Sequence, residues 1–202
     1  MNAPLDQIVF AIQSATQELI DLALSAAPAA SPSEIEAIES EVHSTMLALM
    51  AAAILSHGPF SAGKQAFLQI ILNRPDDTIT NERVVNEYGS RWPSLSRQMP
   101  DFLKRAVAAD LRTGGGTARA MLVFIQIIGN NAAIADGDFV SRENLLVRNY
   151  LAHLEAHIRE RITSFTMFPV LTIDKPFTVQ QFRRSIRRAL DLPPRFPYPP
   201  RP

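Results

Sequence analysis

The chain has 202 residues, 47% of them hydrophobic, and its 20 Lys/Arg are balanced by 20 Asp/Glu. Such a composition supports a buried core and argues against global disorder. The absence of cysteine excludes disulfides, thiolate metal sites and cysteine nucleophiles, and it fits the reducing cytoplasm.

The first half of the chain predicts helices separated by short breaks. Five are expected, over residues 4–26, 32–56, 61–73, 79–88 and 99–112. Ser31 is the expected N-cap of the second helix, and Gly58 is expected to end it in the left-handed conformation. Gly89 and Pro93 are expected to separate the last two helices.

Targeting and membrane segments are not expected. The N-terminus lacks the basic region of a secretory signal and carries an early acidic residue. The most apolar run, residues 46–55, is far shorter than the roughly 20 residues of a membrane span and is typical of a buried core helix. We therefore expect a soluble, cytoplasmic protein.

The second half predicts helices over residues 117–134, 141–165 and 178–190. The glycine run before the first of them is expected to be a loop, because no lysine and hydroxyl residue follow it as a phosphate-binding loop requires. The middle helix has an apolar stripe at Leu145, Val147, Leu151, Leu154, Ile158, Ile162 and Phe165. Only residues 169–174 have a strand pattern, which is too short to build a sheet.

The predicted fold is therefore all-α, in three parts. A compact helical domain is expected over residues 1–168, followed by a short basic amphipathic helical segment over 169–192. A proline-rich tail or linker is expected over 193–202, because its composition does not support a core.

The most distinctive pattern is AIADGDFVSREN at residues 133–144. An apolar helix precedes the turn Asp136-Gly137, Phe139 follows, and Glu143 lies seven positions after Asp136. This pattern resembles the signature of the TerB-like family, the helical domains of the bacterial tellurite-resistance protein TerB and of the DjlA co-chaperones. The resemblance spans residues 40–165 and implies a compact multi-helix bundle with a role in bacterial stress response or defence.

A weaker copy of this motif occurs earlier in the chain. HGPFSAGK at 57–64 aligns with DGDFVSRE at 136–143 through a glycine and a phenylalanine, as duplicated helix–turn–helix units would. The resemblance implies two acidic turns, which have been considered a metal-binding surface. In the first turn His57 and Lys64 replace the two acids, and this degrades a site that needs both turns.

Two interpretations of the second turn remain open. Asp136, Asp138 and Glu143 could bind a divalent cation, although their spacing is not that of an EF-hand. Alternatively, the aspartates form a turn and Glu143 favours the start of the next helix. His153 and His157 lie one helical turn apart and could bind zinc, but the glutamate of the zincin motif is missing directly after the first histidine.

Charge is distributed unevenly along the chain. Residues 1–100 carry five Lys/Arg against eleven Asp/Glu, whereas 101–202 carry fifteen against nine. The expected partner-binding acids are Glu34, Glu36, Glu39 and Glu41. The expected partner-binding bases are Arg183, Arg184, Arg187 and Arg188. These groups either neutralise each other, within the chain or across a homodimer, or they contact an outside partner.

The expected function is a non-enzymatic protein-interaction or regulatory module, because the motifs of common enzyme classes are missing. Its partner would be another protein or a further domain of a longer protein. One alternative is a metal-dependent sensor or enzyme with a divalent cation at the acidic turn. The other is peripheral binding to an anionic membrane, or to nucleic acid, through the C-terminal arginines. Nucleic acid is not favoured, because only one aromatic residue is interleaved with the arginines.

Overall fold

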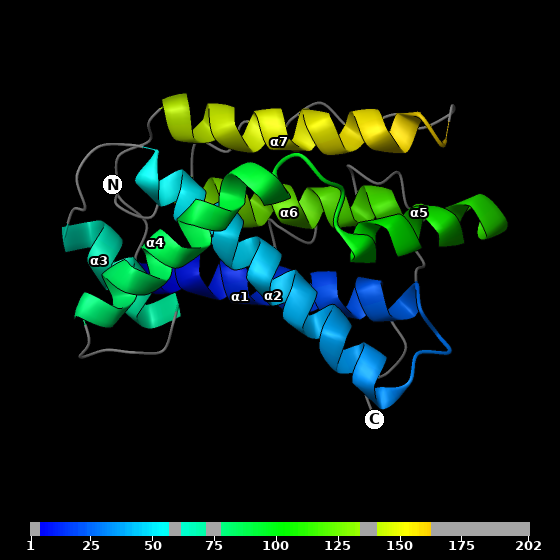
Figure 1. The fold of residues 1–202 in the computed structure, drawn as a ribbon, viewed down its shortest axis with the longest axis horizontal. Coiled ribbons are helices and arrows are strands. Elements are labelled where there is room, and N and C mark those ends of the chain that lie inside the picture. Colours follow the sequence, from blue (N-terminus) through cyan, green and yellow to red (C-terminus); the bar gives the residue numbers. More distant parts are fainter. Residues whose placement is uncertain (1–4, 57–61, 72–77, 134–140, 163–202) are drawn as a thin grey trace.

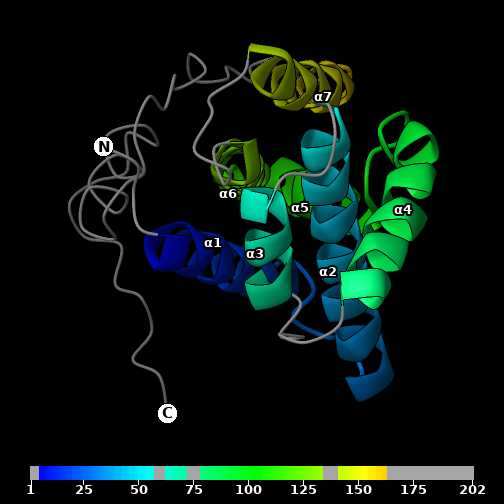
Figure 2. The same cartoon turned by 90° about the vertical axis from the view of Figure 1, so that its left-hand side faces the viewer.

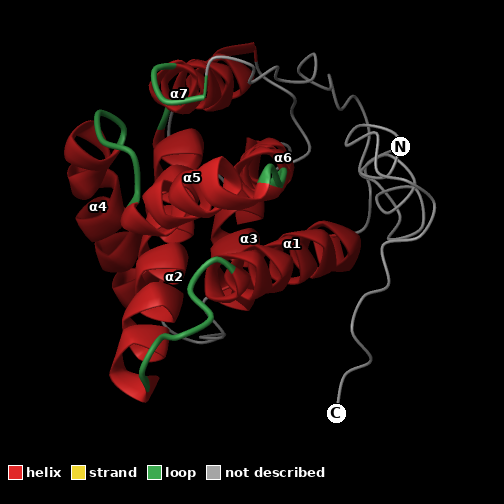
Figure 3. Ribbon diagram, turned by 90° about the vertical axis from the view of Figure 1, so that its right-hand side faces the viewer, coloured by secondary structure: helices red, strands yellow, loops and turns green. Residues whose placement is uncertain are grey.

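The computed structural model describes residues 5–56, 62–71, 78–133 and 141–162, and every regular element in these ranges is a helix (Figure 1). The helices are α1 Leu5–Ser25, α2 Pro32–Leu55, α3 Ala62–Ile71, α4 Thr78–Leu95, α5 Asp101–Thr113, α6 Thr117–Ala133 and α7 Ser141–Arg159. The described part of the chain is drawn as helices and loops alone in Figure 3. The all-α prediction is confirmed for this part.

Helix α6 is the centre of the bundle. Every residue from Ala120 to Ala133 is buried, as expected for a helix that is apolar on all sides. It packs against α1, α2, α5 and α7, and in Figure 1 it runs between α7 and α1. Helix α2 crosses this layer, with α4 packed on its outer side (Figure 2).

Carboxylates hold the N-termini of three helices. Glu34 accepts hydrogen bonds from the Ser31 amide at 2.8 Å and the Ser31 hydroxyl at 2.9 Å, and so fixes the predicted start of α2. Glu41 accepts from the first amides of α5, and Asp110 from the first amides of α6. Acceptors with negative charge are favourable at these positions, because the first amides of a helix have no partner within it.

Helix α4 is longer than predicted, because it ends at Leu95 and not near residue 88. It runs without a break through Gly89 and Pro93. A Cβ at Gly89 would lie 2.5 Å from the Leu55 side chain, so the glycine allows α4 to approach α2 closely. Pro93 lies in the last turn, where it removes one hydrogen bond to the carbonyl four residues earlier, and the helix ends two residues later at Leu95. The glycine loop after α5 is as predicted, with Gly114 in the left-handed conformation at φ 70°.

Helix α7 is shorter than predicted. It ends at Arg159, and the Ile158 carbonyl then accepts hydrogen bonds from the amides of both Arg161 and Ile162. Most of the predicted apolar stripe is buried, but Leu145 is 54% exposed and does not belong to the core. Phe165, Gly58, both turns of the suggested repeat and the whole C-terminal segment from residue 163 lie outside the described residues.

Helix α2 is the one described helix that is long and apolar enough to cross a membrane. Its apolar second half contributes Met46, Leu49 and Ile54 to the core, each at most 2% exposed. Length and composition of this kind are shared by membrane spans and by core helices of soluble proteins. Of the predicted core run 46–55, eight residues are buried, Leu47 is half-buried and Leu55 is exposed.

Candidate functional site

The predicted acidic turn is not described in the structure. Asp136 and Asp138 lie outside the described residues, and Glu143 lies in the first turn of α7, where only the backbone is described. The four C-terminal arginines also lie outside them. Within the described ranges, no group of three His, Asp or Glu side chains is placed to hold a metal ion.

The predicted acidic surface on α2 is partly engaged inside the molecule. Hydrogen bonds from the Ser31 backbone and side chain lower the pKa of Glu34. Burial raises the pKa of Glu41, although its carboxylate accepts from the Asp101 amide at 2.6 Å and the Phe102 amide at 3.1 Å. Glu36 is exposed and Glu39 half-buried, so these two remain available to an outside partner.

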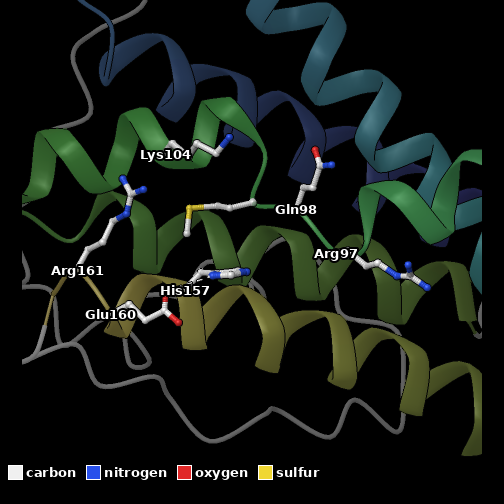
Figure 4. Close-up of a pocket in the computed structure, with 7 residues that line it drawn as sticks. Arg97, Gln98, Lys104, His157, Glu160 and Arg161 are labelled. Carbon is white, nitrogen blue, oxygen red and sulfur yellow. Dashed lines mark hydrogen bonds and ion pairs between the residues drawn. The ribbon is translucent and has the colours of Figure 1, made fainter.

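A pocket of about 290 Å³ lies between the α4–α5 connection and the end of α7 (Figure 4). We call it the cationic pocket; it is lined by Arg97, Gln98, Met99, Lys104, His157, Glu160 and Arg161. Three of these side chains are cations and one is a carboxylate, which gives the lining a formal charge of +2 with histidine neutral. The polar lining groups are mostly hydrogen-bond donors and suit the oxygens of a carboxylate or a phosphate.

The α4–α5 connection is held firmly beneath the pocket. Main-chain hydrogen bonds close its turn, from Arg97 to the Ser94 carbonyl at 3.2 Å and from Gln98 to the Leu95 carbonyl at 3.3 Å. Met99 is only 7% exposed and belongs to the core cluster. The amides that follow at the start of α5 are bonded to Glu41, so α2 fixes the position from which Lys104 enters the pocket.

The charged groups of the pocket differ in how far they are already paired. Lys104 Nζ lies 2.7 Å from Asp101 Oδ1, and His157 Nδ1 lies 3.5 Å from Glu160 Oε2. Arg97 and Arg161 are exposed and form no hydrogen bond or ion pair through their side chains with any other described residue. Arg161 can therefore bind an incoming anion without first breaking another pair, whereas the guanidinium of Arg97 is turned outward at the rim (Figure 4).

A row of polar and aromatic side chains leads along α7 to the pocket. Tyr150 packs edge-on against Trp92 of α4, with ring centroids 4.8 Å apart. His153 and His157 follow, with their rings 4.4 Å apart and nearly perpendicular. Burial raises the pKa of Tyr150, and the negative charge of Glu41 raises it further. The Tyr150 hydroxyl and His153 Nε2 are buried without a hydrogen-bond partner among the described residues.

The predicted histidine pair is brought together, but no third His, Asp or Glu among the described residues completes a metal site with it. His153 Nε2 is buried, and the neighbouring Glu155 is paired with Arg159. Sequence reasoning missed Arg97, Lys104 and Arg161, which meet only through the packing of α7 beside the α4–α5 connection. One signal was present: Tyr150, His153, His157 and Arg161 recur every three or four residues, the spacing of one helix face.

Comparison of the chain with models of known protein families, with curated proteins and with solved structures gave no match.

Proposed function

We propose that the chain is a non-enzymatic protein-interaction module whose cationic pocket receives an anionic side chain of a protein partner. The observation that carries this proposal is that Lys104 and Arg161, from separate segments, line one open pocket whose rim also carries Arg97. Arginine is among the residues enriched at protein interfaces and at their energetic centres. Two of these cations are unpaired within the described part of the chain and are free to meet a partner.

The biological setting belongs to the same proposal. The motif Ala135-Asp136-Gly137, Phe139 and Glu143 and the all-helical bundle support a TerB-like module of the cytoplasm, acting in bacterial stress response or defence. The partner is then another protein, a second copy of this chain or a further domain of a longer one. Exposed Glu36 and half-buried Glu39 on α2 offer a second surface, of opposite charge.

The proposal is tested with a fluorescein-labelled peptide that carries one central glutamate, compared with the same peptide carrying glutamine. The glutamate peptide should bind more tightly, and its affinity should fall as salt is raised, because exposed charges are screened. Replacing both Lys104 and Arg161 by glutamine should weaken binding by about tenfold or more. Fluorescence anisotropy measures each affinity.

Two control variants test whether binding depends on the pocket itself or on positive charge elsewhere on the chain. Arg148→Gln removes a charge from the exposed side of α7, away from the pocket lining, and should leave the affinity unchanged. A second control replaces four arginines together, namely Arg183, Arg184, Arg187 and Arg188. Equal binding of the two peptides, or loss of binding only in this second control, would refute a role for the pocket.

A further inference from the structure

We propose that the anion selected by the cationic pocket is the phosphate monoester of a phosphorylated serine or threonine in the partner protein. This inference rests on the proposed function and narrows it from anions in general to one chemical group. It follows from the charge of the pocket, the arrangement of its donors and its openness to solvent.

The charge of the lining matches a phosphate monoester better than a carboxylate. The three cations and Glu160 give the lining a formal +2 with His157 neutral, and Asp101, which pairs with Lys104 outside the lining, reduces the charge at the pocket to +1. A phosphorylated side chain carries about −1.5 to −2 at pH 7, whereas a carboxylate carries a single charge. A positive site attracts the more negative ion more strongly, so the charge of the pocket favours the phosphate over the carboxylate.

The donors of the pocket come from three separate segments of the fold. Lys104 comes from α5, Arg161 from the turn after α7, and Gln98 from the α4–α5 connection. In Figure 4 Lys104 and Arg161 lie toward one end, His157 is central, and Arg97 lies at the opposite rim with its guanidinium turned outward. A phosphate presents three acceptor oxygens in different directions, so it can be bonded from several sides at once, whereas the two oxygens of a carboxylate lie in one plane.

The pairing of the lining groups sets the role of each. Arg161 is free of partners among the described residues, so it is the principal phosphate ligand. Lys104 is shared with Asp101, and its ammonium has further donors to offer beside that exposed pair. Glu160 is the one like charge in the lining, and it opposes binding of any anion.

The shape of the pocket favours a group presented on a polypeptide over a free small molecule. Small-molecule sites enclose about 70–90% of their ligand's surface. This pocket is shallow and open, with the exposed Gln98 amide at its edge and the buried Met99 beneath. A phosphorylated side chain can reach into such a pocket while its own backbone remains outside and in contact with the rim.

The test uses the full chain and three fluorescein-labelled peptides that differ only at the central residue: phosphoserine, glutamate or serine. The phosphoserine peptide should bind about tenfold or more tightly than the glutamate peptide. The preference should disappear when Lys104 and Arg161 are both changed to glutamine and persist in Arg148→Gln. Glu160→Gln should tighten binding of the phosphoserine peptide. Unchanged fluorescence of Trp92, the one tryptophan, verifies that each variant is folded.

The outcomes separate this inference from the function on which it rests. Equal affinity for phosphoserine and glutamate peptides, both above the serine peptide, overturns the phosphate preference and leaves the anion-binding module standing. Three equal affinities overturn both. Displacement of the phosphoserine peptide by an equal concentration of inorganic phosphate overturns the assignment to a protein segment. Retention of the preference in the Lys104/Arg161 variant overturns the assignment to this pocket.

Discussion

Replacing Gly129 by alanine tests how closely α6 and α7 pack. A Cβ at this position would lie 2.8 Å from both methyl groups of Val147 and 3.4 Å from Leu49 Cδ2. Val147 is fully buried and β-branched, so its side chain cannot rotate away from the new methyl group. Overpacking of this kind costs about 1–3 kcal/mol. Alanine regains about 0.5–1 kcal/mol, because glycine is a poor residue for a helix interior.

The expected net result is a loss of about 1 kcal/mol in the free energy of unfolding, or about 2–4 °C in the midpoint of thermal unfolding. Urea unfolding followed by circular dichroism measures it. Gly89→Ala is a matched control, since its methyl group would meet only the Leu55 side chain, which is 41% exposed and can move. That variant should be neutral or more stable by up to about 1 kcal/mol.

A double-mutant cycle isolates the contact itself. In a Val147→Ala background the space opposite Gly129 is open, so Gly129→Ala should stabilise the chain there by about 0.5–1 kcal/mol. A Gly129→Ala variant as stable as the wild type, or one with the same effect in both backgrounds, would refute the close approach of α6 and α7.

Two further predictions concern polar groups that are wholly or partly buried. Tyr150→Phe removes a hydroxyl that has no hydrogen-bond partner in the described part of the chain, so the free energy of unfolding should stay the same or rise by up to about 1 kcal/mol; a clear loss in urea unfolding would show that the hydroxyl is bonded. Burial raises the pKa of Glu41 above its ordinary value of 4.5, so the folded chain retains a proton that the unfolded chain releases, and wild-type stability should fall as pH rises from about 4.5 through the raised pKa. Glu41→Gln cannot ionise at this position. The free energy of unfolding of the wild type minus that of this variant should therefore be larger at about pH 4 than at about pH 7, and the opposite trend would contradict a raised pKa.

Local signals predicted most of the helices but not their exact lengths. The Ser31-Pro32-Glu34 start of α2 depends on residues within one turn, and the sequence was sufficient to find it. Glycine is a poor helix former, and this local property predicts a break at Gly89. The helix continues through it because α4 packs along α2, and this tertiary packing cannot be read from local propensity.

The candidate site was harder to predict from the sequence than the helices, because it depends on contacts between residues far apart in the chain. The sequence identified His153 and His157 as a pair one helical turn apart, and the structure places their rings in contact. It did not indicate that Arg97 and Lys104 would lie beside them, because that arrangement requires α7 to pack beside the α4–α5 connection. Glu41 was predicted as a partner-binding acid, and its engagement with α5 likewise depends on tertiary packing.

The two carboxylates that hold α5 and α6 differ in how far along the chain they reach. Asp110 binds amides seven and eight residues later, whereas Glu41 binds amides 60 and 61 residues later. Closing a short loop costs less conformational entropy than closing a long one, and local contacts form faster. The corner between α5 and α6 can therefore assemble while most of the chain is still unfolded. The start of α5, and with it one wall of the cationic pocket, gains its final position only after α2 has docked.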